Sequence, residues 1–266
     1  MMLHERHWPI DHPQAVIALV HGAGEHGARY VHFAATMNRA GYAVFGCDLP
    51  GHGQSEGLRG HIESFELYLD ALDYTFQQIE TVYPNLPIVL FGHSMGGLVC
   101  VRFMQTRQPP KELKAVVLTS PCLDLVLPVP PVKVRLAKIL NRVWPSLRQP
   151  NGIKPSDVSR SAEISGQYAS DPLIVTRASA RWFIELQNAM FTARSTNTVF
   201  PVATMILQAG EDRVVSSEAT QKFSEALEAP NKSFRLYPQC YHELLNEPER
   251  EQIMNEILVW LKQLSS

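Results

Sequence analysis

Residues 92–96, Gly-His-Ser-Met-Gly, have the types and spacing of a site for nucleophilic catalysis. The apolar residues 87–91 before them predict a short buried strand, and residues 98–106 after them predict a helix. A G-x-S-x-G sequence between a strand and a helix is typical of a nucleophile elbow, a turn so tight that only glycine fits two residues either side of the serine. We therefore interpret Ser94 as a nucleophile; the alternative is a glycine-rich turn that holds an incidental serine.

His242 is the predicted general base. A serine hydroxyl is a weak nucleophile until a neighbouring imidazole accepts its proton, and a carboxylate orients that imidazole. Folds that carry this elbow have the chain order serine, acid, histidine. His242 is the only one of the ten histidines that follows Ser94. It lies in the predicted loop 238–243, between the last predicted strand and the last predicted helix.

Asp212 is the predicted acid, in a loop that follows the predicted strand 202–207. Asp124 is its rival, because it follows the preceding strand and a carboxylate there is also placed to reach His242. We favour Asp212, since Asp124 also fits a simple residue at the entry to an inserted segment.

Two backbone N–H groups are predicted to bind the oxyanion of a tetrahedral intermediate. The residue after the nucleophile supplies one of them, which is Met95 here. The loop after an early strand supplies the other, and residues 21–24, His-Gly-Ala-Gly, form such a loop. Ala23 is therefore the second predicted donor.

Strands and helices alternate along most of the chain, which predicts an α/β fold. The predicted strands cover residues 16–20, 42–47, 87–91, 113–119, 202–207 and 234–237, and the predicted helices cover residues 30–40, 65–83, 98–106, 216–227 and 249–264. Continuously apolar strands separated by helices indicate a parallel sheet with both faces covered. Sites in such sheets form beyond the carboxyl ends of the strands, where all the motifs above fall.

The alternation breaks between residues 122 and 199, which predicts an inserted cap between the two parts of a core domain, 1–121 and 200–266. One cap helix is predicted near residues 132–143 and a second over residues 181–192. The first has apolar residues on one face, namely Val132, Leu136, Ile139, Leu140 and Val143. Off that face it carries cations, namely Lys133, Arg135, Lys138 and Arg142. Such a helix lies on a lipid surface or packs on its own domain, and we favour packing.

Composition excludes several classes of protein. The 266 residues are 45% hydrophobic and 19% charged, with a net charge of −2, so no general attraction to nucleic acid is expected. No apolar run approaches the length of a membrane span, and the first residues lack the core of a signal peptide. The four cysteines are widely spaced and form no metal or redox motif. We expect a cytoplasmic protein without a cofactor or a bound metal.

Taken together, these motifs resemble the monoacylglycerol lipase and lysophospholipase branch of the α/β-hydrolase superfamily. The segments that carry the resemblance are residues 21–26 with Arg29 and Tyr30, 48–60, 92–97, 210–215 and 242–247. It implies a mostly parallel sheet of seven or eight strands flanked by helices, seven if the family's first strand is absent. It also implies that Ser94, Asp212 and His242 form a catalytic triad, that Ala23 and Met95 form the oxyanion hole, and that a cap covers an acyl channel.

We therefore expect a serine hydrolase that cleaves carboxylic esters of single-chain lipids, above all monoacylglycerols, through an acyl-enzyme. The alternatives are a lysophospholipase, a small-ester carboxylesterase or an aminopeptidase of the same superfamily. An aminopeptidase needs a cap carboxylate for the substrate amine, and Glu163, Asp171 and Glu185 are candidates. A receptor for a small hydrophobic ligand is the non-catalytic alternative. The sequence leaves open the acyl-chain length, the head group, the oligomeric state and peripheral membrane contact through the cap.

Three further features receive other interpretations. Residues 48–55 contain Asp, His and Ser but precede the elbow and are rich in glycine, so we interpret them as a structural turn. Glu25 and Arg29, four residues apart, are expected to form a surface pair or to frame the mouth of the pocket. Cys240, two residues before His242, suggests an activity that is sensitive to thiol reagents.

Overall fold

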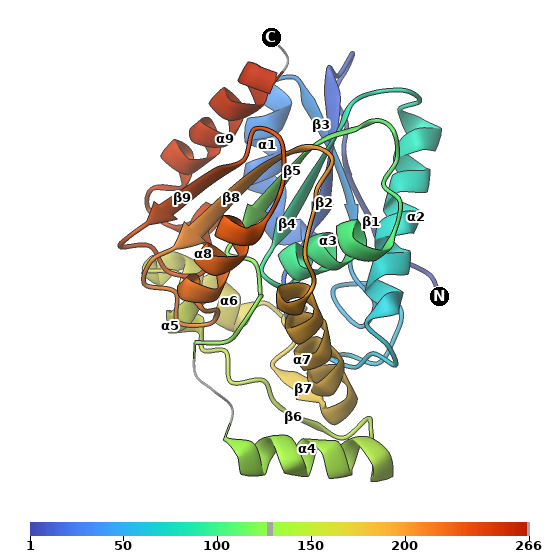
Figure 1. Ribbon diagram of the computed structural model, residues 1–266, viewed down its shortest axis with the longest axis vertical. Coiled ribbons are helices and arrows are strands. Elements are labelled where there is room, and N and C mark those ends of the chain that lie inside the picture. Colours follow the sequence, from blue (N-terminus) through green and yellow to red (C-terminus); the bar gives the residue numbers. More distant parts are fainter. Residues whose placement is uncertain (127–129, 265–266) are drawn as a thin grey trace.

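A central sheet organises the computed structural model, which describes residues 1–126 and 130–264 (Figure 1). Within these residues the sheet has seven strands in the order β1-β3-β2-β4-β5-β8-β9. Their bounds are β1 Glu5–Trp8, β2 Ala15–Val20, β3 Tyr42–Cys47, β4 Ile88–His93, β5 Leu113–Thr119, β8 Ala203–Ala209 and β9 Ser233–Tyr237. Strand β1 pairs antiparallel with β3, and every other neighbouring pair is parallel. The predicted α/β class and the mostly parallel sheet are confirmed.

Helices cover both faces of the sheet, and for this reason the central strands are apolar throughout. On one face lie α1 (Val31–Arg39), which the short helix η1 (Gly27–Tyr30) precedes, and α9 (Arg250–Leu264), which η2 (Leu244–Asn246) precedes. On the other face lie α2 (Glu66–Val82), α3 (Met95–Thr106) and α8 (Ser217–Ala226). Strands β2, β3, β4 and β8 are buried at every residue, as a sheet enclosed on both sides requires.

Strand β1 is the one strand of the central sheet that sequence analysis missed. Its residues, Glu-Arg-His-Trp, alternate between exposed and half-buried positions. At the edge of the sheet a strand needs to bury only part of one face, so no apolar run marks it in the sequence. With β1 the sheet has seven strands within the described residues, one of the two numbers expected.

A long insertion separates β5 from β8 in the chain, although these strands are neighbours in the sheet. We call residues 122–199 the cap segment. Its described elements are α4 (Pro131–Val143), β6 (Arg148–Pro150), α5 (Pro155–Val158), α6 (Ala162–Ser170), β7 (Arg177–Ser179) and α7 (Ala180–Ser195). The two predicted cap helices correspond to α4 and α7. The antiparallel pair β6–β7 and the helices α5 and α6 were not predicted, because elements of three to nine residues give little periodic signal.

The first cap helix packs on its own domain, as favoured, but the prediction that it does so through its apolar face is wrong for four of the five apolar residues; Leu140 alone of the five is partly buried. Val132, Leu136, Ile139 and Val143 are 73%, 51%, 54% and 79% exposed. Helix α4 contacts α7, where Asn141 Oδ1 accepts from Arg181, and the partly buried residues of the helix are Val134, Ala137, Leu140 and Asn141. The small Ala137 and the polar Asn141 made that side inconspicuous in the sequence. In Figure 1, α4 lies at the end of the molecule farthest from the sheet.

Candidate active site

Ser94 lies in the strained turn that its sequence motif predicts. It follows β4 directly and immediately precedes α3, with φ 52° and ψ −118°, a conformation that non-glycine residues rarely adopt. A Cβ on Gly92 would lie 2.7 Å from the carbonyl oxygen of Gly96, and one on Gly96 would lie 2.2 Å from that of Val20. Glycine is therefore required on both sides, and the turn presents the Ser94 hydroxyl at the carboxyl end of the strand.

Ser94, His242 and Asp212 form one hydrogen-bonded chain. His242 Nε2 lies 2.8 Å from Ser94 Oγ, and His242 Nδ1 lies 2.8 Å from Asp212 Oδ2. Because the carboxylate only accepts, Nδ1 carries a proton and Nε2 of the neutral ring is free to accept the serine proton. The three residues follow β4, β9 and β8, whose carboxyl ends meet at one edge of the sheet.

The carboxylate of Asp212 is fixed by its own loop. Its Oδ1 accepts the N–H groups of Val214 at 2.8 Å and Val215 at 2.9 Å, while Oδ2 faces His242. The rival Asp124 lies elsewhere: its Oδ2 is 3.3 Å from Arg194 Nη2, and its side chain is 48% exposed. The structure thus brings Asp212, and not Asp124, against the imidazole.

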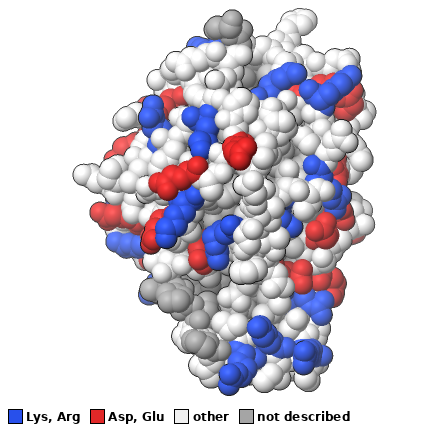
Figure 2. All heavy atoms as spheres, viewed as in Figure 1, with Lys and Arg blue, Asp and Glu red and all other residues white. Residues whose placement is uncertain are grey.

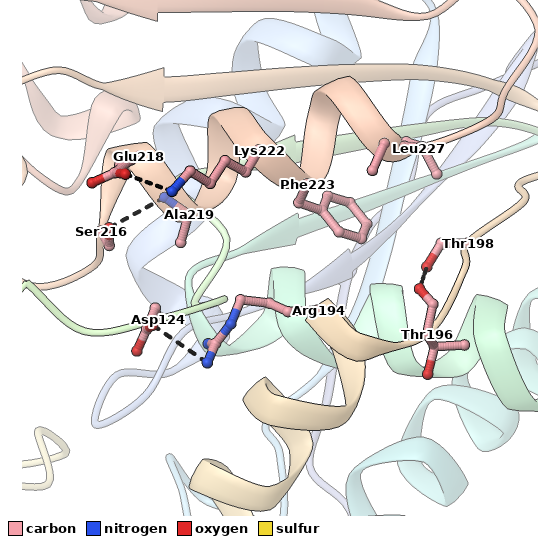
Figure 3. Close-up of a pocket in the computed structure, with 11 residues that line it drawn as sticks. Asp124, Arg194, Thr196, Thr198, Ser216, Glu218, Ala219, Lys222, Phe223 and Leu227 are labelled. Atoms are coloured by element: carbon pink, nitrogen blue, oxygen red, sulfur yellow. Dashed lines mark hydrogen bonds and ion pairs between the residues drawn. The ribbon is translucent and has the colours of Figure 1, made fainter.

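Asp124 lines a separate cavity of about 490 Å³ between the end of α7 and α8 (Figure 3). Arg194, Thr196 and Phe223 also line it. Its charged groups pair with one another, Asp124 with Arg194 and Glu218 with Lys222. The cavity contains no member of the Ser94–His242–Asp212 chain.

Two charge effects act on His242. Burial disfavours its imidazolium form, but the charge of Asp212 and the hydrogen bond to it outweigh burial and raise the pKa of His242. His93, the variable residue of the elbow, packs its ring 4.9 Å from that of His242. Burial and the proximity of His242 lower the pKa of His93 to about 4, so this second imidazole stays neutral. Sequence analysis gave His93 no role, because the elbow pattern tolerates any residue there.

The two predicted oxyanion donors lie at the start of α3 and in the loop that follows β2. Met95 opens α3, so its N–H has no acceptor within the helix. Ala23 follows Gly22, whose N–H donates to Glu25 Oε1 at 2.6 Å. Both Ala23 and Ser94 line a small cavity with His242. Ala23 and the serine hydroxyl thus border the same cavity, and the role of the two N–H groups as oxyanion donors stays a prediction.

Glu25 is buried and Arg29 is partly buried, so the two do not form the exposed surface pair that was one of the expectations. Arg29 donates to Glu25 Oε2 at 2.7 Å and to both carboxylate oxygens of Glu243 at 2.6 and 2.7 Å. Burial alone would raise the pKa of Glu25, but Arg29 outweighs it and lowers that pKa to about 2. Arg29 therefore ties the Gly22–Glu25 loop to the residue that follows His242. Glu243 was missed because its partner lies 214 residues away in the chain.

The cap segment covers the triad. The cavity at Ser94 is lined from the cap by Ile153, Val158 and Tyr168 and has a volume of about 10 Å³, no more than a single water needs. Ser94 and His242 are each 5% exposed. The space beside Ser94 is therefore too small for an ester substrate.

The three cap carboxylates considered for an amine-binding role already have partners. Glu163 accepts from Gln167 within α6, and Glu185 accepts the N–H of Phe65. Asp171 accepts from the ring of His26. These contacts argue against an aminopeptidase that uses these residues.

Asp48 organises the turn that we interpreted as structural. Its carboxylate accepts the N–H groups of Gly27 and Gln54 and pairs with Arg6.

Cys240 is 3% exposed, and burial raises the pKa of its thiol to about 12, so little of the reactive thiolate is present at neutral pH. The low reactivity of this thiol argues against the expectation that thiol reagents rapidly block activity by modifying Cys240.

The fold and this arrangement of side chains define an α/β-hydrolase. The family model described as "Serine aminopeptidase, S33" matches residues 11–249, and the chain belongs to that family. The chain is 35% identical to phospholipase YtpA of Bacillus subtilis (92% of this chain and 94% of the relative) and 34% identical to the human monoglyceride lipase (97% and 86%). Its structure matches that of the Paleococcus ferrophilus monoacylglycerol lipase with a TM-score of 0.89 at 31% identity, over 99% of this chain and all of that one. These relatives identify the protein as a carboxylic ester hydrolase.

Replacing Asp212 with Asn is expected to lower kcat by about 1,000- to 10,000-fold, because the amide no longer holds His242 in the required tautomer. Steady-state kinetics on a soluble ester and a thermal unfolding curve would show this loss in a folded protein. Asp124→Asn is the matched control and should retain most of the activity. The reverse result, an active Asp212→Asn and an inactive Asp124→Asn, would overturn the assignment.

Acid pH is expected to abolish kcat/KM with a midpoint above 6.5, the ordinary pKa of histidine. His242 accepts the serine proton only when it is neutral, and its pKa is raised, so activity is lost as the pH falls through that raised value. A pH profile of kcat/KM on an uncharged ester measures the midpoint. A midpoint at or below 6.5 would contradict the electrostatic account of the site.

Proposed function

We propose that this protein hydrolyses carboxylic esters of single-chain lipids, above all monoacylglycerols, with Ser94 as nucleophile, His242 as base and Asp212 as the group that orients His242. The observation that carries this proposal is the continuous hydrogen-bonded chain from Ser94 Oγ to Asp212 Oδ2 beneath the cap segment. The lipases among the relatives support the substrate class.

The proposed reaction follows from this geometry. His242 Nε2 takes the proton of Ser94 as its oxygen attacks the ester carbonyl, and the N–H groups of Ala23 and Met95 stabilise the oxyanion that forms. The intermediate collapses, His242 returns the proton to the leaving alcohol, and an acyl group stays on Ser94. Water then gives a proton to His242 and attacks the acyl-enzyme, which releases the carboxylic acid and regenerates the hydroxyl.

A phospholipid-derived substrate is the second candidate. The specific observation that favours it is the 35% identity to a relative named as a phospholipase. A lysophospholipid and a monoacylglycerol both present one acyl ester, so the same catalytic groups would serve either. The head group would then be selected by the cap segment.

We infer further that residues 1–121 and 200–266 form the catalytic core and that residues 122–199 form a mobile cap. Supporting this division, β5 and β8 pair directly while the whole segment leaves and rejoins the core between them. The cavity at Ser94 is too small for an ester, and movement of the cap residues that line it would admit one.

Helix α4 supports a proposal of peripheral membrane contact. Its apolar side chains Val132, Leu136, Ile139 and Val143 are exposed although the helix contacts α7. Exposed cations lie beside them, namely Arg135, Lys138 and Arg142, and residues 131–144 include no acidic residue. At the lowest part of the face, where Figure 1 places α4, Figure 2 shows basic groups and no acidic ones. An apolar stripe flanked by cations fits an anionic lipid surface, from which a lipid substrate would be drawn.

No helix among the described residues is long and apolar enough to cross a bilayer. We propose that the protein works in a reducing compartment such as the cytoplasm, because its four cysteines are free and buried.

A panel of monoacylglycerols, lysophospholipids, p-nitrophenyl esters and amino-acid anilides tests the proposed substrate class. We expect turnover of the monoacylglycerols and the esters, no turnover by Ser94→Ala, and little or no turnover of the anilides. Equal or better turnover of anilides would overturn the lipid assignment. A native protein that turns over no ester would instead favour a receptor.

Replacing Leu136 and Ile139 together with Gln is expected to weaken binding to phosphatidylglycerol vesicles by about tenfold or more, because each apolar side chain contributes about 1.5 kcal/mol or more when buried. Vesicle co-sedimentation measures the binding, and added salt should weaken that of the native protein. Val259→Gln, which alters an apolar residue of α9 that is 49% exposed, is the matched control. Equal binding by the native protein and the double variant would contradict a role of α4.

A further inference from the structure

The loop that carries Ala23 is held from two sides, by the core and by the cap segment. On the core side, Arg29 donates to Glu25 Oε2 at 2.7 Å, and Glu25 Oε1 accepts the N–H of Gly22 within the loop. On the cap side, the N–H of Val175 donates to the carbonyl oxygen of Gly24 at 2.8 Å. Two residues further on, His26 Nε2 lies 2.8 Å from Asp171 Oδ2. The core thus holds this short loop at Glu25, and the cap segment holds it at Gly24 and His26.

The cap residues that make these contacts belong to one turn, residues 171–175. Asp171 Oδ1 accepts the N–H of Leu173 at 2.8 Å, and the carbonyl oxygen of Asp171 accepts that of Ile174. Asn151 fixes the far end, because its Nδ2 donates to the carbonyl oxygen of Val175 at 2.8 Å. The turn therefore presents the Asp171 carboxylate and the Val175 N–H as a single unit.

His26 depends on Asp171 for its hydrogen bonding. The ring is 4% exposed, and its Nδ1 has no partner. Since a carboxylate only accepts, Nε2 must carry the proton. In the neutral ring Nδ1 then carries a lone pair, so it is not a buried N–H group without an acceptor. If the cap turn withdrew, the remaining polar group of this buried ring would also lose its partner, at a cost in free energy.

Gly24 fits the cap turn closely. It has φ +74°, a conformation that favours glycine, and a Cβ there would lie 2.9 Å from the carbonyl oxygen of Val175. Any larger residue would push the turn and the loop apart. The contact therefore depends on both partners having their present shape.

We propose that the cap turn 171–175 positions the oxyanion hole, so that closure of the cap fixes Ala23 in its catalytic orientation and Asp171 and His26 act as positioning residues. This inference rests on the proposed function. Because the cap must move to admit a substrate, the turn would leave the loop and return to it in each cycle. The hole would then be complete only behind a bound substrate, where a preorganised donor contributes most to catalysis.

The test compares the native protein with Asp171→Ala, Asp171→Asn and the matched control Glu163→Gln, which alters an exposed carboxylate of α6. Two rates are measured per active site: kcat on p-nitrophenyl butyrate and phosphonylation of the serine by a fluorophosphonate, whose phosphonyl oxygen requires the oxyanion hole. Active-site titration gives the fraction of competent protein. We expect Asp171→Ala to lower both rates by about 10- to 100-fold with little change in KM, since a small misplacement of a catalytic group is costly. Asp171→Asn should restore part of the loss, and Glu163→Gln should match the native protein.

Gly24→Ala disturbs the same contact from the loop and should lower the same two rates. Combined with Asp171→Ala it should lower the rates little further, because both changes disrupt the same contact between the Ala23 loop and the cap turn. Native per-site rates in Asp171→Ala, or a loss confined to the titrated active fraction, would overturn the inference and leave the turn a structural element. A native protein that fails to react with the fluorophosphonate would instead refute the proposed function, and this inference with it.

Discussion

The hydrogen bond between His242 Nε2 and Ser94 Oγ is the contact that the proposed chemistry requires and that the rest of the structure serves to form. It joins residues 148 positions apart in the chain, so no local sequence preference can form it. The sheet forms it instead: Ser94, Asp212 and His242 follow β4, β8 and β9, and in a parallel sheet these strands end at the same edge. Both helical layers and the two apolar cores serve to keep those strand ends in register.

The parts of the site that depend on the sheet could be predicted from the sequence. The elbow is marked by Gly92 and Gly96, whose close backbone contacts leave no room for a side chain. Chain order in such folds singled out His242, and the long apolar strands were found because burial on both faces leaves few polar positions. The choice of Asp212 over Asp124 was less secure, since both follow a strand. The two differ in the side chain that each one contacts: Asp212 contacts His242, and Asp124 contacts Arg194.

The cap segment could not be predicted to the same degree, for physical reasons. Its strands of three residues and its helix α5 of four residues carry no period, and their stability comes from contacts with distant core residues. Examples are the N–H of Glu243, which donates to the carbonyl oxygen of Val158, and the contact of His26 with Asp171. Helix α4 was found, but its packing was misjudged because the apolar face is the one that points away from the protein. An apolar stripe reveals a surface without revealing what covers it.

Reaction of the protein with a fluorophosphonate, followed by peptide mapping, tests the central claim most directly. A strained, base-activated hydroxyl should react far faster than any other serine. The account predicts one phosphonyl group per chain on Ser94, with none on the Ser94→Ala protein and none when His242 is protonated at acid pH. Stoichiometric labelling of a different serine, or undiminished ester hydrolysis by Ser94→Ala, would contradict it.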